Sequence, residues 1–244
     1  MNTRIAVVTG GGSGIGRATC TRLTADGFTL AVLDVDGEAA KVAAGPDGLG
    51  CAADVADRDA VDAAFAQVVA AFGRIDVLVN NAGVSGTLEA TICHETTVEE
   101  WDRVLAINTR GPFLCARAAL PVMLAQGDGH VITVASVAGQ VAFPGRCAYT
   151  ASKGAALMFA KSLAADYAAA GIRSNAVCPG FVRTPMTQWR LDVPELREQV
   201  EARIPTGRVA EPDDIADAIA VLASGRLGYM TGAALVVDGG WTVL

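Results

Sequence analysis

The chain has 244 residues, of which 52% are hydrophobic and only 5% aromatic, a composition typical of an α/β core packed from small aliphatic side chains. The net charge of −7 without a basic cluster argues against nucleic acid as a partner, and the sequence shows neither a signal-peptide pattern nor an apolar run near the ~20 residues of a membrane span. Six scattered cysteines without a C-x-x-C pair and two histidines predict no disulfide framework and no metal site, so we expect a cytoplasmic protein with reduced cysteines that acts on a small molecule.

A glycine-rich turn near the start of the chain predicts a phosphate-binding site. Residues 5–8 are small and apolar, as in a buried parallel strand, and a helix is expected to follow the turn. Glycine permits positive φ and lets a diphosphate approach the backbone, where the N–H groups of the new helix attract it. The glycine spacing only approximates G-x-G-x-x-G, so a simple glycine-rich turn is the alternative. The cofactor-binding residues expected here are Gly10, Gly12, Ser13, Gly14, Ile15 and Gly16.

An acidic residue ends the second predicted strand, residues 29–33. Asp34 lies about 20 residues beyond the glycine turn, where a carboxylate accepts hydrogen bonds from both hydroxyls of an adenosine ribose. The same carboxylate repels the 2′-phosphate of NADP, and the sequence therefore predicts NAD as cofactor. The alternative is that Asp34 only caps the next turn.

Strands and helices alternate along the rest of the chain, which predicts a single α/β domain, residues 1–244, with one doubly wound parallel sheet and helices on both faces. Gly73 ends the first long helix, and Thr97 with Glu100 forms an expected capping box. Asn108 and Gly111 interrupt the helix that follows. Further strands are predicted at 49–53, 75–79, 130–134, 172–177 and 234–237, and helices at 57–72, 113–124, 149–167 and 211–222.

Tyr149 and Lys153 are four residues apart and project from one face of a predicted helix. An adjacent ammonium group favours phenolate and brings the pKa of a tyrosine toward neutral pH, where it exchanges a proton. A Tyr-x-x-x-Lys pair is common by chance on a surface. Here Ser136 stands at the carboxyl end of the strand at 130–134, so its hydroxyl is expected to share a substrate oxygen with the phenol.

Taken together, these motifs resemble the short-chain dehydrogenase/reductase family in its compact, single-domain branch, and the resemblance spans essentially the whole chain. The matching motifs, in order, are Thr9-Gly10-x-x-x-Gly14-x-Gly16, Asp54-Val55, Asn80-Asn81-Ala82-Gly83, Asn108, Ser136, Tyr149-x-x-x-Lys153, Pro179-Gly180, Thr231-Gly232 and Val237-Asp238-Gly239-Gly240.

The resemblance implies a Rossmann-like sheet of about seven strands in the order 3-2-1-4-5-6-7 and, usually, a homotetramer. Tyr149 would be the general acid/base, and Lys153 would lower its pKa and hold the nicotinamide ribose. Ser136 would orient the substrate oxygen, and Asn108 would support a proton-relay water. Further cofactor contacts are expected at Asp54, Val55, Asn81, Ala82, Gly83, Pro179, Gly180, Val182 and Thr184.

The function expected from these residues is an NAD(H)-dependent oxidoreductase that interconverts a secondary alcohol and a ketone by hydride transfer. Two alternatives remain. A 3-oxoacyl-carrier-protein reductase would require a basic docking patch, for which Arg146, Arg183, Arg190 and Arg208 are available, but Asp34 argues against its usual NADPH. A non-catalytic NAD-binding scaffold or sensor is the other.

The substrate pocket is expected between residues 139–146, residues 84–88 and a mobile covering loop at 181–206. Val141 and Leu191 are further apolar walls, and Gln140 is the one uncharged polar side chain near Ser136. We therefore expect a small neutral alcohol or ketone, and we expect residues 241–244 to be buried between subunits of the tetramer. The substrate-binding residues expected are Ser136, Gln140, Phe143, Tyr149, Met186 and Trp189.

Overall fold

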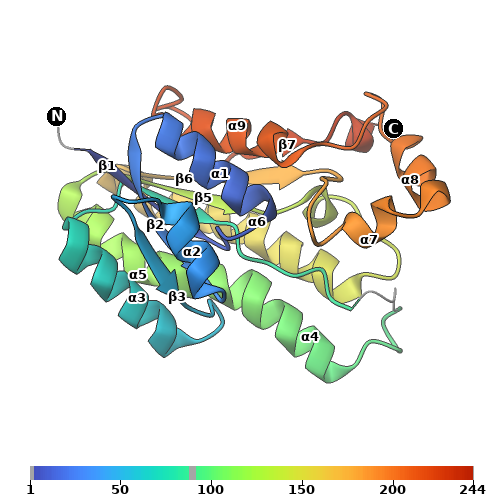
Figure 1. The fold of residues 1–244 in the computed structure, drawn as a ribbon, viewed down its shortest axis with the longest axis horizontal. Helices are drawn as coiled ribbons and strands as arrows, with labels where there is room; N and C mark the ends of the chain where they lie inside the picture. Colours follow the sequence, from blue (N-terminus) through green and yellow to red (C-terminus); the bar gives the residue numbers. More distant parts are fainter. Residues whose placement is uncertain (1–2, 88–91, 244) are drawn as a thin grey trace.

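The computed structural model describes residues 3–87 and 92–243, and its centre is one parallel sheet. Seven strands pair in the order β3-β2-β1-β4-β5-β6-β7, which confirms the predicted α/β fold and its strand order (Figure 1). Leu88 of the expected pocket wall and Leu244 of the expected buried tail lie outside the described residues. The strands are β1 (Arg4–Thr9), β2 (Phe28–Asp34), β3 (Leu49–Ala52), β4 (Val77–Asn80), β5 (Gly129–Val134), β6 (Ile172–Pro179) and β7 (Ala234–Val237).

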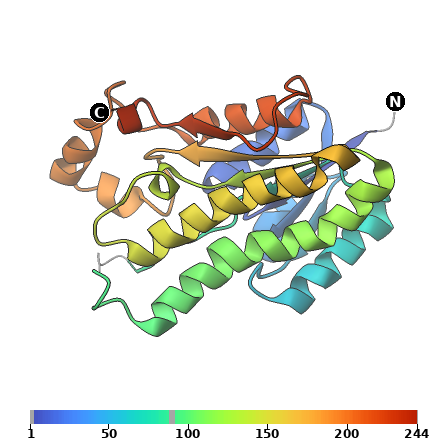
Figure 2. The same ribbon diagram turned by 180° about the vertical axis from the view of Figure 1, so that it is seen from behind.

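Helices cover both faces of the sheet (Figures 1 and 2). Alternate strand residues point to opposite sides, so that Val7 packs toward α3, α5 and α6 whereas Val8 packs toward α1, α2 and α9. The helices are α1 (Gly14–Ala25), α2 (Gly37–Ala44), α3 (Arg58–Phe72), α4 (Val98–Leu105), α5 (Gly111–Gln126), α6 (Cys147–Tyr167), α7 (Gln188–Leu191), α8 (Pro194–Glu201) and α9 (Pro212–Ala223). Short 3-10 or π segments are η1 (Ala106–Arg110), η2 (Val137–Gly139), η3 (Ala168–Ala170) and η4 (Trp241–Val243).

The long helix around Asn108 is continuous but changes its winding. α4 passes through the π-helical segment η1 into α5, which explains why the sequence shows an interruption at Asn108 and Gly111. A Cβ at Gly111 would lie 2.8 Å from a methyl group of Val55, so only glycine fits this contact. The expected capping box is only half formed: the Thr97 side chain accepts the N–H of Glu100, but the Glu100 carboxylate accepts the N–H of Thr87 and pairs with Arg103.

The segment 181–206 is more structured than a simple loop. It contains the helices α7 and α8. Leu191 and Val200 pack with Ile204 and Val209 in a small apolar cluster of their own. Leu191 is therefore buried in this cluster and does not form a pocket wall. No helix in the described ranges 3–87 and 92–243 combines the length and apolarity that crossing a membrane needs.

A buried polar network joins β5, β6 and the segment after α9. Nδ1 of His130 lies 3.1 Å from the Leu222 carbonyl oxygen, and Nε2 lies 2.9 Å from the amide nitrogen of Asn175. That amide also donates to the Met230 carbonyl, and its oxygen accepts the N–H of Ala233, so its orientation is set. His130 is therefore neutral, with its proton on Nδ1. Burial, aided by the charge of Arg173, lowers the pKa of His130 to about 3.

We predict that this histidine makes stability depend on acid pH. His130 takes up a proton near pH 6.5 in the unfolded state but only near pH 3 in the folded state. The free energy of unfolding therefore falls as pH decreases between these values. The slope from this one group is at most roughly 1.4 kcal/mol per pH unit. Urea unfolding of the parent and of His130→Gln between pH 4.5 and 7.5 measures it. The variant should show a shallower slope, while the exposed His94→Gln keeps the parental slope; equal slopes in all three proteins would contradict the prediction.

Candidate active site

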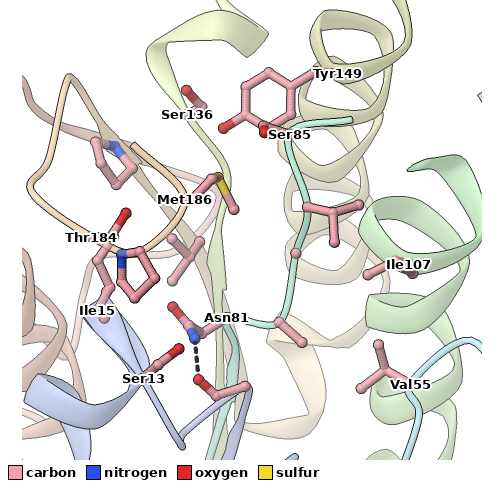
Figure 3. Close-up of a pocket in the computed structure, with 18 of the residues that line it drawn as sticks. Ser13, Ile15, Val55, Asn81, Ser85, Ile107, Ser136, Tyr149, Thr184 and Met186 are labelled. Atoms are coloured by element: carbon pink, nitrogen blue, oxygen red, sulfur yellow. Dashed lines mark hydrogen bonds between the residues drawn. The ribbon is translucent and has the colours of Figure 1, made fainter. Parts of the chain in front are cut away.

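A cavity of about 630 Å³ runs along the carboxyl ends of the strands. Ser136, Ser85 and Tyr149 lie at one end of it, and Ser13 and Asn81 lie toward the other (Figure 3). Most of the residues expected to bind cofactor or substrate border this cavity. They are Gly10, Ser13, Gly14, Ile15, Asp34, Asp54, Val55, Asn81, Ala82, Gly83, Ser136, Tyr149, Lys153, Pro179, Gly180, Val182, Thr184 and Met186.

The glycine turn is held against β4 by hydrogen bonds from Asn81. Its side-chain amide donates to the carbonyls of Thr9 and Gly10, both at 3.0 Å, and the Thr9 hydroxyl accepts the N–H of Asn81 and of Ala82. A Cβ at Gly16 would lie 2.0 Å from the Gly10 carbonyl oxygen. Gly16 is thus required for packing the turn, and it is buried rather than part of the cavity lining.

Asp34 is fixed at the cavity by backbone donors. Its carboxylate oxygens accept the N–H of Gly12 at 2.8 Å and of Asp36 at 3.0 Å. The first bond explains the place of Gly12, which holds Asp34 without bordering the cavity. The second is the turn-capping bond that the sequence left as the alternative.

These residues fit a dinucleotide. The carboxylate suits a ribose, and Gly10 and Gly14 adopt positive φ (63° and 50°), which lets the backbone approach a diphosphate. Ser13, the N-cap of α1, makes no side-chain capping hydrogen bond, so its side chain leaves the first-turn N–H groups to an anion. At the opposite end, the hydroxyls of Ser136 and Tyr149 suit the reacting oxygen of a substrate.

Asn108 connects two segments of the site by hydrogen bonds. Its amide donates to the Val84 carbonyl at 2.8 Å and to the Ser152 hydroxyl at 3.0 Å, and its oxygen accepts the N–H of Val84 at 2.8 Å. Ser152 in turn donates to the Tyr149 carbonyl at 2.7 Å. Asn108 therefore ties the loop after β4 to α6, and it is buried behind the cavity rather than in its lining.

Burial dominates the proton affinities of the tyrosine and lysine. It raises the pKa of Tyr149 above its ordinary value, opposed by the hydrogen bond with Ser136, and it lowers the pKa of Lys153 to about 8. The sequence predicted that Lys153 would lower the pKa of Tyr149. In the structure the Lys153 ammonium donates to the Val134 carbonyl at 2.9 Å and lies 5.7 Å from the centre of the phenol ring, and desolvation is the largest influence on the pKa of Tyr149.

A second cavity of about 550 Å³ shares Ser85, Ser136, Tyr149 and Met186 with the first. Phe143 and Trp189 line it as expected. Gln140 borders neither cavity; it is exposed, and its amide donates to Sγ of Cys178 at 3.7 Å. Val141 is also exposed and absent from the lining. Lining residues beyond those expected include Phe181, Leu196, Gln199, Val200 and Trp241.

Three arginines also line the second cavity, whose walls were expected to be mainly apolar. These arginines are Arg146, Arg190 and Arg203. Burial and the charge of Arg190 lower the pKa of Arg146, whereas the charge of Glu100 raises it. Nε of Arg190 is buried without a hydrogen-bond partner, and no carboxylate among the described residues pairs with Arg190 or Arg203. The sequence offered Arg146 and Arg190 for a basic patch but not Arg203, because the three residues come from the N-cap of α6, from α7 and from the segment just after α8.

Two of the unexpected lining residues carry a sequence signal. Ile107 precedes the buried Asn108, and Trp241 follows a Gly-Gly pair after the last strand, at the edge of the sheet where ligands collect. The others, such as Leu196 and Gln199 on α8, resemble any amphipathic surface helix in the sequence.

Comparisons with known proteins agree with this geometry. A family model described as enoyl-(acyl carrier protein) reductase matches residues 10–242. The chain is 52% identical over 249 residues to a 2-(R)-hydroxypropyl-CoM dehydrogenase of Xanthobacter autotrophicus, a match covering 99% of this chain and 100% of that protein. A 3-oxoacyl-[acyl-carrier-protein] reductase of Staphylococcus aureus is 39% identical, with 98% of each chain covered.

A solved structure matches equally broadly. The crystal structure of gox2181 is similar with a TM-score of 0.95 and 34% identity, covering 100% of this chain and 97% of that one. Since both the sequence and the fold match along their whole length, this chain belongs to the short-chain dehydrogenase/reductase family and is an oxidoreductase that uses a nicotinamide cofactor on secondary alcohols and ketones.

Proposed function

We propose that the enzyme uses NAD(H) and acts on a small secondary alcohol, or the matching ketone, that carries an anionic group at its far end. The observation that carries the substrate part is the lining of the second cavity, which Arg146, Arg190 and Arg203 share with Ser136 and Tyr149. A cavity lined both by hydroxyl groups and by guanidinium groups suits a molecule with an alcohol and a sulfonate or carboxylate. This replaces the neutral substrate expected from the sequence.

The similarity to a 2-(R)-hydroxypropyl-CoM dehydrogenase supports this class of substrate. A hydroxypropyl thioether of coenzyme M has a secondary alcohol at one end and a sulfonate at the other. A similar small thioether or alkyl sulfonate would fit a cavity of about 550 Å³. We propose that the substrate of this enzyme likewise has an alcohol at one end and an anionic group at the other, with the anionic end toward the arginines.

The proton chemistry is assigned to Tyr149. In ketone reduction the phenol gives its proton to the carbonyl oxygen, and burial favours this neutral form by raising its pKa. In alcohol oxidation the phenolate takes the hydroxyl proton. The nicotinamide ring, when bound, accepts or delivers the hydride. Ser136 hydrogen-bonds the same substrate oxygen, Lys153 binds the cofactor ribose, and Asn108 keeps the loop after β4 in position.

The segment 181–206 is proposed to cover the substrate, because Met186, Trp189 and Arg190 face the second cavity from it. The homotetramer and the cytoplasmic location remain predictions. Exposed apolar side chains on α5 and α6, Phe113 and Met158, provide a surface suited to assembly.

The first prediction from this proposal concerns Tyr149. Tyr149→Phe should bind NAD as the parent does, because the ring still packs, but lose about 10²- to 10⁴-fold in kcat, because no proton is exchanged. Alcohol oxidation by the parent should increase with pH as phenolate forms, from neutral into the alkaline range, since the pKa of Tyr149 is raised. Steady-state kinetics and NADH titration measure both. Substantial turnover by the variant would assign the acid/base role to another residue. It would still exclude the alternative of a non-catalytic scaffold.

The second prediction concerns cofactor choice. A 2′-phosphate beside the fixed carboxylate of Asp34 costs roughly 1–3 kcal/mol, so kcat/KM should favour NAD over NADP about tenfold to a hundredfold. Asp34→Ala should reduce this preference by weakening NAD and improving NADP. Asp36→Ala is the control, because it removes a neighbouring carboxylate that caps α2. Equal efficiency with the two cofactors in the parent would refute the proposal.

The third prediction tests the anionic end of the substrate with two thioethers of the same length. Arg190→Gln should lower kcat/KM for a 2-hydroxypropyl thioether of ethanesulfonate about tenfold to a hundredfold, because a buried charge-assisted hydrogen bond is worth about 1.5–3 kcal/mol. The second compound is the 2-hydroxypropyl thioether of propane, which has the same length but carries no charge. Its turnover should change little.

Arg183→Gln is the matched control for Arg190→Gln, since Arg183 pairs with Glu211 at 2.9 Å and does not line the cavity. Equal losses on both thioethers, or a parent that prefers the uncharged one, would contradict an anion-binding end. A parent that turns over only carrier-linked 3-oxoacyl substrates would instead support the alternative function.

A further inference from the structure

The C-terminal turn is built to hold one aromatic side chain in place. After β7, Asp238 accepts hydrogen bonds from the N–H of Gly240 at 2.8 Å and from the N–H and hydroxyl of Thr242 at 2.9 and 2.7 Å. The Thr206 N–H donates to the Gly239 carbonyl at 3.1 Å, and a Cβ at Gly240 would lie 2.9 Å from Pro205. The turn is therefore fixed beside the end of α8, as Figure 1 shows.

The side chain held by this turn is Trp241, which contacts two parts of the second cavity. Its indole stacks on Phe143, with ring centres 5.9 Å apart and planes 12° from parallel. The Arg203 guanidinium lies over the same indole, 4.5 Å from the ring centre. All three side chains line the cavity. Phe143 follows Ser136 by seven residues, so this stack joins the segment after Ser136 to the end of α8.

We infer that Trp241 determines substrate specificity by closing the cavity wall between Phe143 and Arg203, which limits the length of substrate accepted. The inference rests on the proposed function only in that the substrate occupies the second cavity. An indole anchored by a hydrogen-bonded turn is a rigid wall, and the charge of Arg203 is attracted to its face. Without the indole, the wall opens and the exposed Arg203 loses its contact.

A purely structural role is the competing explanation, because Trp241 also packs on the apolar cluster of Leu191, Val200, Ile204 and Val209. A lost packing contact would lower stability or turnover equally for every substrate. A wall, by contrast, changes the ratio between short and long substrates. The test must therefore measure that ratio.

The experiment uses two series of secondary alcohols, each a 2-hydroxyalkane lengthened by one methylene at a time. One series ends in a sulfonate and the other in a methyl group. The parent, Trp241→Ala, Trp241→Leu and Trp241→Phe are compared by kcat/KM and by thermal midpoint. Trp241→Leu keeps apolar volume against the cluster and is the second variant should Trp241→Ala not fold. Val42→Ala, a change at an exposed position of α2 that lines neither cavity, is the control.

In the parent, kcat/KM should fall sharply once the alkyl chain of the substrate exceeds the length that the cavity accepts. Trp241→Ala should raise the ratio of long to short substrates about tenfold, and Trp241→Leu should raise it less. Trp241→Phe and Val42→Ala should leave the ratio near parental. An unchanged ratio in folded Trp241→Ala or Trp241→Leu would overturn the inference, as would an equal loss across the series. A shifted ratio in the methyl series, without sulfonate preference in the parent, would retain Trp241 as the wall while refuting the anionic substrate.

Discussion

The hydrogen bonds from Asn81 to the Thr9 and Gly10 carbonyls set the geometry on which the rest of the site depends. They hold the glycine turn, where a diphosphate would lie, against the loop that continues from β4. That loop is held in turn by Asn108, whose amide also reaches Ser152 on the helix of the tyrosine and lysine. One chain of side-chain amides thus sets the distance between the phosphate-binding turn and α6, and a dinucleotide requires that distance to be fixed.

Burial is the largest influence on the pKa values of Tyr149 and Lys153. Lys153 is buried, donates to a backbone carbonyl and has its pKa lowered to about 8, whereas burial raises the pKa of Tyr149. Desolvation disfavours the charged form of each group, so the two shifts have opposite signs but one cause. The site therefore favours the neutral phenol, which is the form needed to protonate a ketone, and alcohol oxidation is expected to depend on alkaline pH.

The net charge of −7 coexists with three arginines around one small cavity. A net charge describes the average field of the molecule and its long-range partners, whereas a bound ligand senses groups within about a Debye length, near 10 Å at 0.1 M salt. Guanidinium groups in a partly buried wall are screened less than those on the surface. An acidic protein is therefore well able to select an anionic substrate, provided that the cations lie inside the pocket and the carboxylates outside it.

Motifs with a fixed local geometry were predictable from the sequence. Glycines at a tight turn, a strand-end carboxylate and the Tyr-x-x-x-Lys pair have their geometry set by a few neighbouring residues, and alternating apolar strands and helices determine a parallel sheet. The second cavity was not predictable in this way. Arg146, Arg190 and Arg203 meet only because α6, α7 and α8 converge, and Trp241 joins them only because the last strand ends at the same edge of the sheet. The sequence by itself thus determined the fold, the cofactor class and the expected catalytic residues. Only the tertiary structure decided which charged and aromatic side chains line the second cavity, because contacts between distant segments have no periodicity or spacing in the sequence.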